Sequence, residues 1–556
     1  MPFTVIVITY AIAMTGLIII PGVDDQGNVY HFSIFEAFYF VSYTATTIGF
    51  GEIPYPFTDA QKMWVSASIY ITVLGWFYGI GTLVSLLQDK LFLSQIAIAR
   101  FKRSVKHIKE DFVIILGYND TTSEIIKKML ESKMRVVVIE QDQQRADYLH
   151  LEGFVPAVPV LVSDAYNPLS LEYAGIKSIH CKAIISLFEK NILNLRVTLS
   201  SKILNPHVKI AVRSATSDDT GNLLDAGANI VENPFQIIAY QIQMSLNTPS
   251  LFKIENWLYK IDTLDSKTFS IPNKNILICG FGRLGESVYK ILIKNGIVPT
   301  IIESDPKIVE KAFNHDVRNL ILGNAEDKYF LDKAAIHNIE LVFIATNNDT
   351  TNLSIVSTVK HMNKKALIIS RENKLSDFSI FSHAKIDHIF IPDQILIHKT
   401  TNAIINPLCD RMIRLLTHEG EQWGRKLLAT LMKSIHHNPL TVELTINKQD
   451  AIEIYKYLKV INNTLTIKQL QASRRDRNQT NNLIPILVVR YDKDILLPDS
   501  NFEIEINDKI LFACDENAKD DLEYIANNVY EFHYAIEGVE KTYFTKFLKN
   551  QNKENV

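Results

Sequence analysis

The chain has 556 residues, which is too long for one hydrophobic core, so three or four domains are expected. Its 58 basic and 61 acidic side chains leave a formal net charge of −3, and no overall basic field indicates a nucleic-acid partner. The 4 cysteines form no CxxC pair, which argues against structural zinc or a disulfide framework and favours reduced cytosolic thiols.

Two long apolar runs, residues 3–20 and 63–87, contain no Asp, Glu, Lys or Arg. A helix needs roughly 20 apolar residues to cross a membrane, and both runs qualify, the first only just. A signal peptide is the alternative for the first run, but a basic start and a small-residue cleavage site before Pro21 are missing. We therefore predict two membrane spans within a domain covering residues 1–92.

The charges beside the spans predict their orientation. Basic residues cluster after the second run, at Lys90, Arg100, Lys102, Arg103, Lys106 and Lys109, whereas the charged residues of segment 21–62 are five acids and one lysine. Basic flanks remain in the cytoplasm. The N-terminus and everything after about residue 88, beginning with a linker at 93–110, are therefore expected in the cytoplasm, and 21–62 is expected outside.

Between the spans, residues 33–52 read as a short apolar helix followed by the string TIGFG. An amphipathic surface helix is the simpler alternative for its first part. A re-entrant half-helix explains more, because Gly49 and Gly51 adopt backbone angles closed to other residues, and alternating them with Ile48 and Phe50 lets successive carbonyls point the same way. Four such loops around one axis would form rings of oxygens that replace the water around a cation, with the Thr47 hydroxyl below them.

These residues resemble the pore of potassium channels with two spans per subunit. The match covers Thr46, the filter Thr47–Gly51 and the acidic Glu52 at the outer mouth, with Phe50 and Glu52 in place of the more usual tyrosine and aspartate. Tyr43 stands where some relatives carry a glutamate behind the filter. The resemblance implies potassium as the permeant ion, a homotetramer, and a multi-pass protein in a bacterial-type inner (plasma) membrane.

The second run contains Gly75, Gly79 and Gly81. A glycine inside a helix costs roughly 1 kcal/mol relative to alanine, so each has a reason to be there. Close packing between membrane helices is one reason. A bend that opens and closes the pore is the other, and all three glycines remain candidates for that hinge.

Residues 111–395 contain one pattern twice, in which an apolar strand ends in glycine, a helix follows, and the next strand ends in glutamate. Gly117 and Glu140 in the first copy correspond to Gly280 and Glu303 in the second. Asp164-Ala165 likewise corresponds to Asn324-Ala325, and further strands are expected at 183–187, 208–213, 341–346 and 367–371. This alternation predicts two α/β domains, each with a doubly wound parallel sheet.

The second copy has a complete phosphate loop, whose residues are Gly280, Phe281, Gly282, Arg283, Leu284 and Gly285. The first glycine makes the turn, the second lets a pyrophosphate approach, and the third allows helix and strand to touch. Glu303 is placed to bind ribose hydroxyls, which favours NAD(H) or an adenine nucleotide over NADP. Asn324, Ala325 and Thr346 complete the expected site, and a fold relic with a vacant pocket is the alternative.

The first copy reads Gly117-Tyr118-Asn119-Asp120-Thr121-Thr122 at the same place. Side chains at the second and third glycine positions, Asn119 and Thr122, would crowd a pyrophosphate. We therefore expect this copy to be structural or to bind a different ligand, and to bind NAD weakly or not at all.

Both copies resemble the RCK domain, the regulator of potassium conductance, which is also found in Trk-type uptake regulators. The resemblance implies domains at 111–260 and 273–437, a small α+β Trk-type domain at 438–530, and a polar tail at 540–556. Calcium-gated relatives place carboxylates after the fourth and fifth strands of the first copy, where this chain has Ser186 and Arg213, so no metal site is expected there.

The combined motifs indicate a tetrameric potassium channel whose cytoplasmic domains bind a nucleotide and thereby gate the pore, with no enzymatic activity. One alternative is a membrane-tethered NAD-dependent oxidoreductase, but no catalytic acid or base stands out. Another is a regulatory subunit of a separate potassium transporter, which the attached filter argues against. A ligand can shift the gate only if it binds the open and closed states with different affinity.

Overall fold

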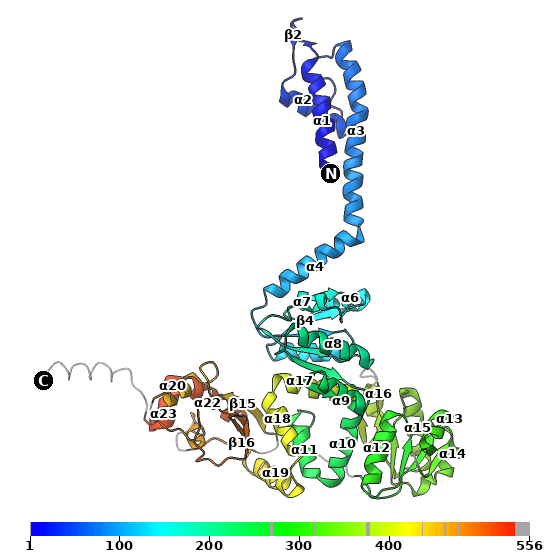
Figure 1. The fold of residues 1–556 in the computed structure, drawn as a ribbon, viewed down its shortest axis with the longest axis vertical. Helices are drawn as coiled ribbons and strands as arrows, with labels where there is room; N and C mark the ends of the chain where they lie inside the picture. Colours follow the sequence, from blue (N-terminus) through cyan, green and yellow to red (C-terminus); the bar gives the residue numbers. More distant parts are fainter. Residues whose placement is uncertain are drawn as a thin grey trace, which may run out of the picture. The chain divides into compact units, whose positions relative to one another are not determined.

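The computed structural model describes residues 2–266, 271–314, 317–373, 378–435, 438–460, 463–474 and 479–539. The chain divides into two compact units, Met1–Ser104 and Val105–Val556 (Figure 1). The polar tail expected at 540–556 lies outside the described residues. The predicted fold class is confirmed, because a helical N-terminal region precedes two parallel sheets in tandem and a C-terminal antiparallel sheet.

The first unit is helical. It contains α1 (Pro2–Ile19), a hairpin of β1 (Gly22–Val23) and β2 (Val29–Tyr30), α2 (Ile34–Ala45), α3 (Asp59–Gln88) and the start of α4 (Lys90–Lys106). Helices α1 and α3 lie side by side in Figure 1. Ser33 begins α2 with a capping box, because its hydroxyl accepts from the Glu36 N–H while the Glu36 carboxylate accepts from the Ser33 N–H.

Helix α3 is long and apolar enough to cross a membrane, and among the described helices it is the one that meets both criteria. The apolar helix Phe3–Ile19 is slightly short. The 18 residues of α1 rise about 27 Å, against roughly 30 Å for the hydrocarbon core. The first of the two expected spans therefore remains a prediction.

The second unit begins with a six-stranded parallel sheet in the order β5-β4-β3-β6-β7-β8. Its strands are β3 (Phe112–Leu116), β4 (Arg135–Glu140), β5 (Val160–Val162), β6 (Cys181–Ser186), β7 (Lys209–Arg213) and β8 (Ile230–Glu232). Its helices are α5 (Asp120–Glu131), α6 (Gln143–Leu151), α7 (Pro168–Tyr173), α8 (Asn191–Leu204) and α9 (Ser217–Asp225). The strand order reverses between β3 and β6, as in dinucleotide-binding folds.

The second sheet repeats this topology in the order β11-β10-β9-β12-β13-β14. Its strands are β9 (Ile276–Cys279), β10 (Thr300–Glu303), β11 (Leu320–Leu322), β12 (Leu341–Ile344), β13 (Leu367–Arg371) and β14 (His388–Phe390). Between them lie α12 (Arg283–Lys294), α13 (Pro306–Asn314), α14 (Lys328–Lys333), the 3₁₀ helix η1 (Ile336–Asn338), α15 (Asp349–Met362) and α16 (Phe378–His383). The central strands β9 and β12 are buried throughout and are accordingly apolar.

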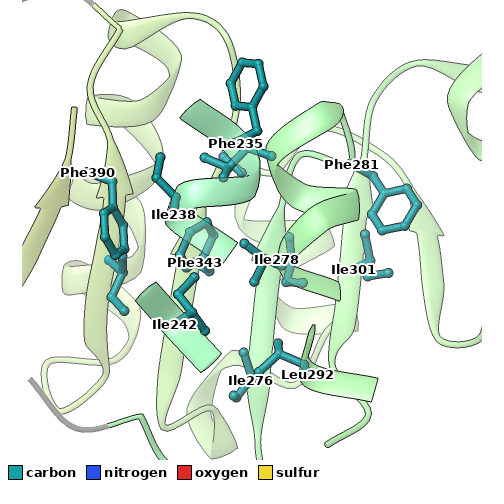
Figure 2. Close-up of a cluster of buried hydrophobic side chains, with 14 of the residues drawn as sticks. Phe235, Ile238, Ile242, Ile276, Ile278, Phe281, Leu292, Ile301, Phe343 and Phe390 are labelled. Atoms are coloured by element: carbon teal, nitrogen blue, oxygen red, sulfur yellow. The ribbon is translucent and has the colours of Figure 1, made fainter. Parts of the chain in front are cut away.

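The two copies exchange helices. Helix α10 (Pro234–Asn247) follows the first sheet but buries Phe235, Ile238 and Ile242 in the core of the second sheet, beside Ile278 and Phe343 (Figure 2). Helix α17 (Pro392–Ile405) follows the second sheet and packs into the core of the first through Leu396 and Ile397. Each sheet thus depends on the other copy for part of its hydrophobic cover.

The remaining elements form the C-terminal part. Its antiparallel sheet has the order β15-β18-β16-β17 and comprises β15 (Leu440–Thr445), β16 (Leu483–Arg490), β17 (Lys493–Leu496) and β18 (Lys509–Cys514). One face packs against α11 (Pro249–Leu258), α18 (Pro407–Leu416) and α19 (Glu421–Ile435). The other is covered by α20 (Ile452–Leu458), α21 (Ile467–Leu470), α22 (Glu516–Asn527) and α23 (Val529–Glu537).

Two histidines line a small cavity of about 70 Å³ next to the exchanged helices. Burial lowers the pKa of both His388 and His398 to about 4, from an ordinary value of 6.5. Between pH 6.5 and 4 the unfolded chain therefore binds protons that the folded chain does not. Each histidine stabilises the fold fully above pH 6.5, and this contribution is lost as the pH falls toward 4.

Replacing His398 by asparagine should remove one of these titrations. Between pH 6.5 and 4, each fall of one pH unit should lower the unfolding free energy of wild type by about 1.4 kcal/mol relative to that of His398→Asn. Chemical unfolding of the 105–556 fragment between pH 4 and 7.5 measures it. The exposed His337→Asn is the matched control, and a pH-independent difference for His398→Asn would contradict the assignment.

Candidate functional site

The loop after α2 has an alternating backbone. Thr47, Gly49 and Gly51 have positive φ angles of 61°, 65° and 95°, whereas the residues between them, Ile48 and Phe50, do not. A positive φ is uncommon for a residue other than glycine, so Thr47 is held there by its surroundings. The alternation is the arrangement that turns successive carbonyl groups to one side, which is what a ring of carbonyl ligands requires.

Aromatic residues hold this loop. The Tyr43 hydroxyl donates to the Gly51 carbonyl at 2.6 Å, and the Tyr43 carbonyl accepts from the Ile48 N–H at 2.9 Å. The Phe50 ring meets the Tyr43 ring edge-on. The Glu52 carboxylate accepts from the Phe57 N–H at 2.8 Å. Tyr43 is thus a structural support of the loop, a role for which the sequence offered no signal beyond its position.

Helix α3 runs without a break through the three hinge candidates. A Cβ on Gly75 would lie 2.7 Å from Oγ1 of Thr9 on α1, so close packing accounts for this glycine. A Cβ on Gly81 would meet no atom of the described chain within 4 Å. Gly79 is buried. Packing explains Gly75, and the hinge role of all three stays a prediction.

A cavity of about 350 Å³ lies at the carboxyl ends of β9, β10 and β12, where the strand order reverses. Parallel α/β sheets bind ligands at this place. Of the predicted site residues, the cavity is lined by Gly280, Gly282, Arg283, Glu303, Asn324, Ala325 and Thr346. Sequence reasoning missed its other polar lining residues, Ser304, Asp305, Asn347, Asn348, Thr351 and Arg371.

The glycines of the loop serve different purposes. Gly280 has φ 95°, and a Cβ on Gly285 would lie 2.1 Å from the Gly280 carbonyl oxygen, so both are required by the close turn. A Cβ on Gly282 would meet no described atom within 4 Å, because this residue faces the cavity. Phe281 and Leu284 are buried in the core and do not line the cavity. Of the six motif residues, Gly280, Gly282 and Arg283 therefore line the cavity, whereas Phe281, Leu284 and Gly285 do not.

Glu303 is 7% exposed, and its carboxylate is bonded to the backbone. One oxygen accepts from the Phe281 N–H at 2.5 Å, and the other accepts from the N–H groups of Ser304 and Asp305 at 2.7 and 2.8 Å. Glu303 thus fixes the phosphate loop relative to the end of β10. The first copy repeats this bond, because the Glu140 carboxylate accepts from the Tyr118 N–H at 2.5 Å.

Two arginines make one end of the cavity positive. The Cζ atoms of Arg283 and Arg371 lie 4.6 and 5.1 Å from the centre of the Phe235 ring, which comes from α10 of the first copy. Burial and then the charge of Arg283 lower the pKa of Arg371 to about 10, so it stays protonated at neutral pH. Its Nε has no hydrogen-bond partner among the described residues. This end suits an anionic group.

The first copy has a different surface at the same place. Asn119 caps α5, because its side-chain oxygen accepts from the Thr122 N–H at 2.9 Å, and the Thr122 hydroxyl accepts from the Asn119 N–H at 2.8 Å. The helix N–H groups that a phosphate would use are therefore partly occupied by the helix's own side chains. In the second copy Gly282 begins α12 without any side-chain cap.

Residues 3–89 match the family model for an ion channel domain, and residues 113–234 and 276–392 each match the model for the TrkA-N domain. The chain is therefore a fusion of an ion channel domain with two TrkA-N domains, and the resemblance to a channel pore joined to tandem RCK domains is confirmed. This class of protein combines a pore with regulatory Rossmann-like domains.

Two of the similar proteins carry names from potassium transport. Potassium channel protein 1 of Methanocaldococcus jannaschii is 23% identical over 243 residues, which are 44% of this chain and 71% of the relative. A Trk system potassium uptake protein TrkA homolog of Pyrococcus abyssi is 28% identical over 152 residues, 26% of this chain and 66% of the relative. An uncharacterized protein of Methanothermus fervidus is 29% identical over 248 residues, and the chain spans only 38% of its length.

Among solved structures, the chain matches the GsuK channel at 15% identity and a TM-score of 0.49 over 97% of this chain and 98% of that one. A second structure, the GsuK channel bound to NAD, has 14% identity and a TM-score of 0.48 over 94% of this chain and 97% of that one.

Proposed function

We propose that this chain is the subunit of a homotetrameric potassium channel in a cell membrane, gated by a nucleotide that binds its second TrkA-N domain. The observation that carries the proposal is the alternating backbone of Thr47, Gly49 and Gly51 at the end of a half-helix. Four such loops around one axis supply the carbonyl rings that replace the hydration shell of potassium. The basic residues after α3 support a cytoplasmic position for the N-terminus and the TrkA-N domains.

The nucleotide proposal rests on the cavity at the end of β9. This cavity brings together the uncapped N-terminus of α12, an open face at Gly282 and the positive charges of Arg283 and Arg371. These features suit the pyrophosphate of NAD(H) or an adenine nucleotide. Its volume of about 350 Å³ lies within the usual range of ligand pockets.

Purified protein in liposomes tests the function against its alternatives. A channel should show passive potassium flux that changes with NAD, NADH, ADP or ATP. An oxidoreductase would instead turn over NADH without potassium flux, and a regulatory subunit of a separate transporter would do neither. Cross-linking or mass measurement in detergent should show four chains per particle.

Replacing Glu303 by alanine should weaken nucleotide binding tenfold or more, because the variant loses both the acid for the ribose and the anchor of the phosphate loop. Isothermal calorimetry with ADP or NADH measures the affinity. Glu140→Ala is the matched control, since Glu140 makes the same backbone bond in the first copy. Equal losses of affinity in both variants would show that Glu303 acts only through the stability of the fold. Potassium selectivity should be unchanged in both, because the filter belongs to the other unit.

A further inference from the structure

The exchanged helices α10 and α17 begin in the same way but present different side chains to the opposite copy. Each starts with a proline, Pro234 or Pro392, which one residue separates from the last strand of its own sheet. The next residue is Phe235 in α10 and Asp393 in α17. Each of these two side chains contacts the first turn of a helix and a strand-end arginine of the other copy.

In the first copy, the Asp393 carboxylate contacts the start of α5 and an arginine at a strand end. One oxygen of this carboxylate accepts from the Thr121 hydroxyl at 3.0 Å, and the other lies 3.9 Å from Nη1 of Arg213. Thr121 belongs to the first turn of α5, and Arg213 ends β7. A helix N-terminus and a basic side chain at a strand end are the groups that hold a phosphate in this fold.

In the second copy, the corresponding residue, Phe235, is uncharged. The Phe235 ring contacts the guanidinium groups of Arg283 and Arg371 without neutralising them. Arg371 ends β13 as Arg213 ends β7. Arg213 therefore lies beside the Asp393 carboxylate, whereas Arg371 lies against the Phe235 ring and lines the cavity, with the charges of Asp349 and Asp393 also acting on it.

We propose that Asp393 is the built-in anion of the first copy, and that it takes the place which a ligand phosphate takes in the second. The residue that follows the helix-initiating proline then decides which copy accepts a phosphate-bearing ligand. A carboxylate keeps the first copy closed to such ligands, and a phenyl ring leaves the second open. The proposal rests on the proposed function only in treating the second copy as the nucleotide site.

The competing explanation is that Asp393 merely stabilises the start of its own helix, since an acid in the first turn interacts favourably with the helix dipole. That explanation predicts no new binding site when the charge is removed. The proposal predicts one, because neutralising Asp393 leaves Arg213 and the start of α5 without their anion. Asn119 and Thr122 still crowd a dinucleotide, so the site should accept a compact anion.

The experiment uses full-length protein in detergent with the second copy blocked by Gly282→Asp. Inorganic phosphate is titrated against chloride at constant ionic strength, and the thermal unfolding midpoint is measured. Adding Asp393→Asn should at least double the phosphate-dependent rise of the midpoint. Asp120→Asn is the matched control, because it removes one exposed negative charge from the same helix start. A response to Asp393→Asn no larger than that to Asp120→Asn overturns the proposal.

The converse substitution is Phe235→Asp in the wild-type background, with Phe235→Leu as the neutral control. A carboxylate between Arg283 and Arg371 should lower ADP affinity tenfold or more relative to the leucine variant, and equal affinities contradict the assigned role of Phe235. If wild type binds no nucleotide, the proposed function fails, while the phosphate titration still decides the role of Asp393.

Discussion

Replacing Gly282 by aspartate is expected to abolish nucleotide binding to the second TrkA-N domain without unfolding it. Gly282 has φ −70° and faces the cavity, so an L-residue fits its backbone. Aspartate is also a favourable N-cap and would bond to the N–H groups of α12 that a phosphate needs. Losing two charge-assisted hydrogen bonds costs about 1.5–3 kcal/mol each, which corresponds to a hundredfold or greater loss of affinity.

Calorimetry with ADP and NADH measures this loss, and single-channel recording tests whether the nucleotide response of the open probability disappears with it. Gly221→Asp is the matched control, because Gly221 is also free of neighbouring atoms but lies on α9. A Gly282→Asp variant that binds nucleotide as wild type does would refute the assignment of this loop to a phosphate. The variant copies what Asn119 already does in the first copy.

Replacing Gly49 by alanine is expected to abolish potassium flux while leaving a folded tetramer. Gly49 has φ 65°, a conformation that costs an L-residue about 1–2 kcal/mol, so alanine should rotate the neighbouring peptide and remove a carbonyl from the ring. A Cβ there would meet no described atom within 4 Å, so the methyl group itself makes no clash within the chain. In mixed potassium and sodium solutions, the reversal potential of the wild-type channel should follow the equilibrium potential of potassium.

Flux in liposomes and particle mass in detergent give the two readouts. Gly27→Ala is the matched control, because Gly27 has φ 84° in the hairpin turn of the same unit and equal freedom from neighbours. It should carry the same backbone strain and conduct normally. Unchanged flux in Gly49→Ala, or equal passage of sodium and potassium in wild type, would exclude the loop as a selectivity filter.

The sequence by itself determined the architecture and the local motifs. Strand–helix alternation predicted two parallel sheets, because a buried parallel strand needs a continuous apolar run and each crossover needs a helix. The spacing of Gly280, Gly282 and Gly285 predicted the phosphate loop, because the turn, the approach of a ligand and the helix contact each require a missing side chain. Each of these signals lies within its own continuous stretch of chain.

Only the tertiary structure revealed the residues that reach the sites from elsewhere. Arg371 lines the cavity because β13 lies beside β12, and Phe235 reaches Arg283 and Arg371 because α10 crosses to the other copy. Asp393 reaches the first copy by the reciprocal crossing of α17. Sequence periodicity shows that a helix is amphipathic, but it does not show which sheet the apolar face will cover. That choice is made by long-range packing, and it places a carboxylate in one copy and a phenyl ring in the other.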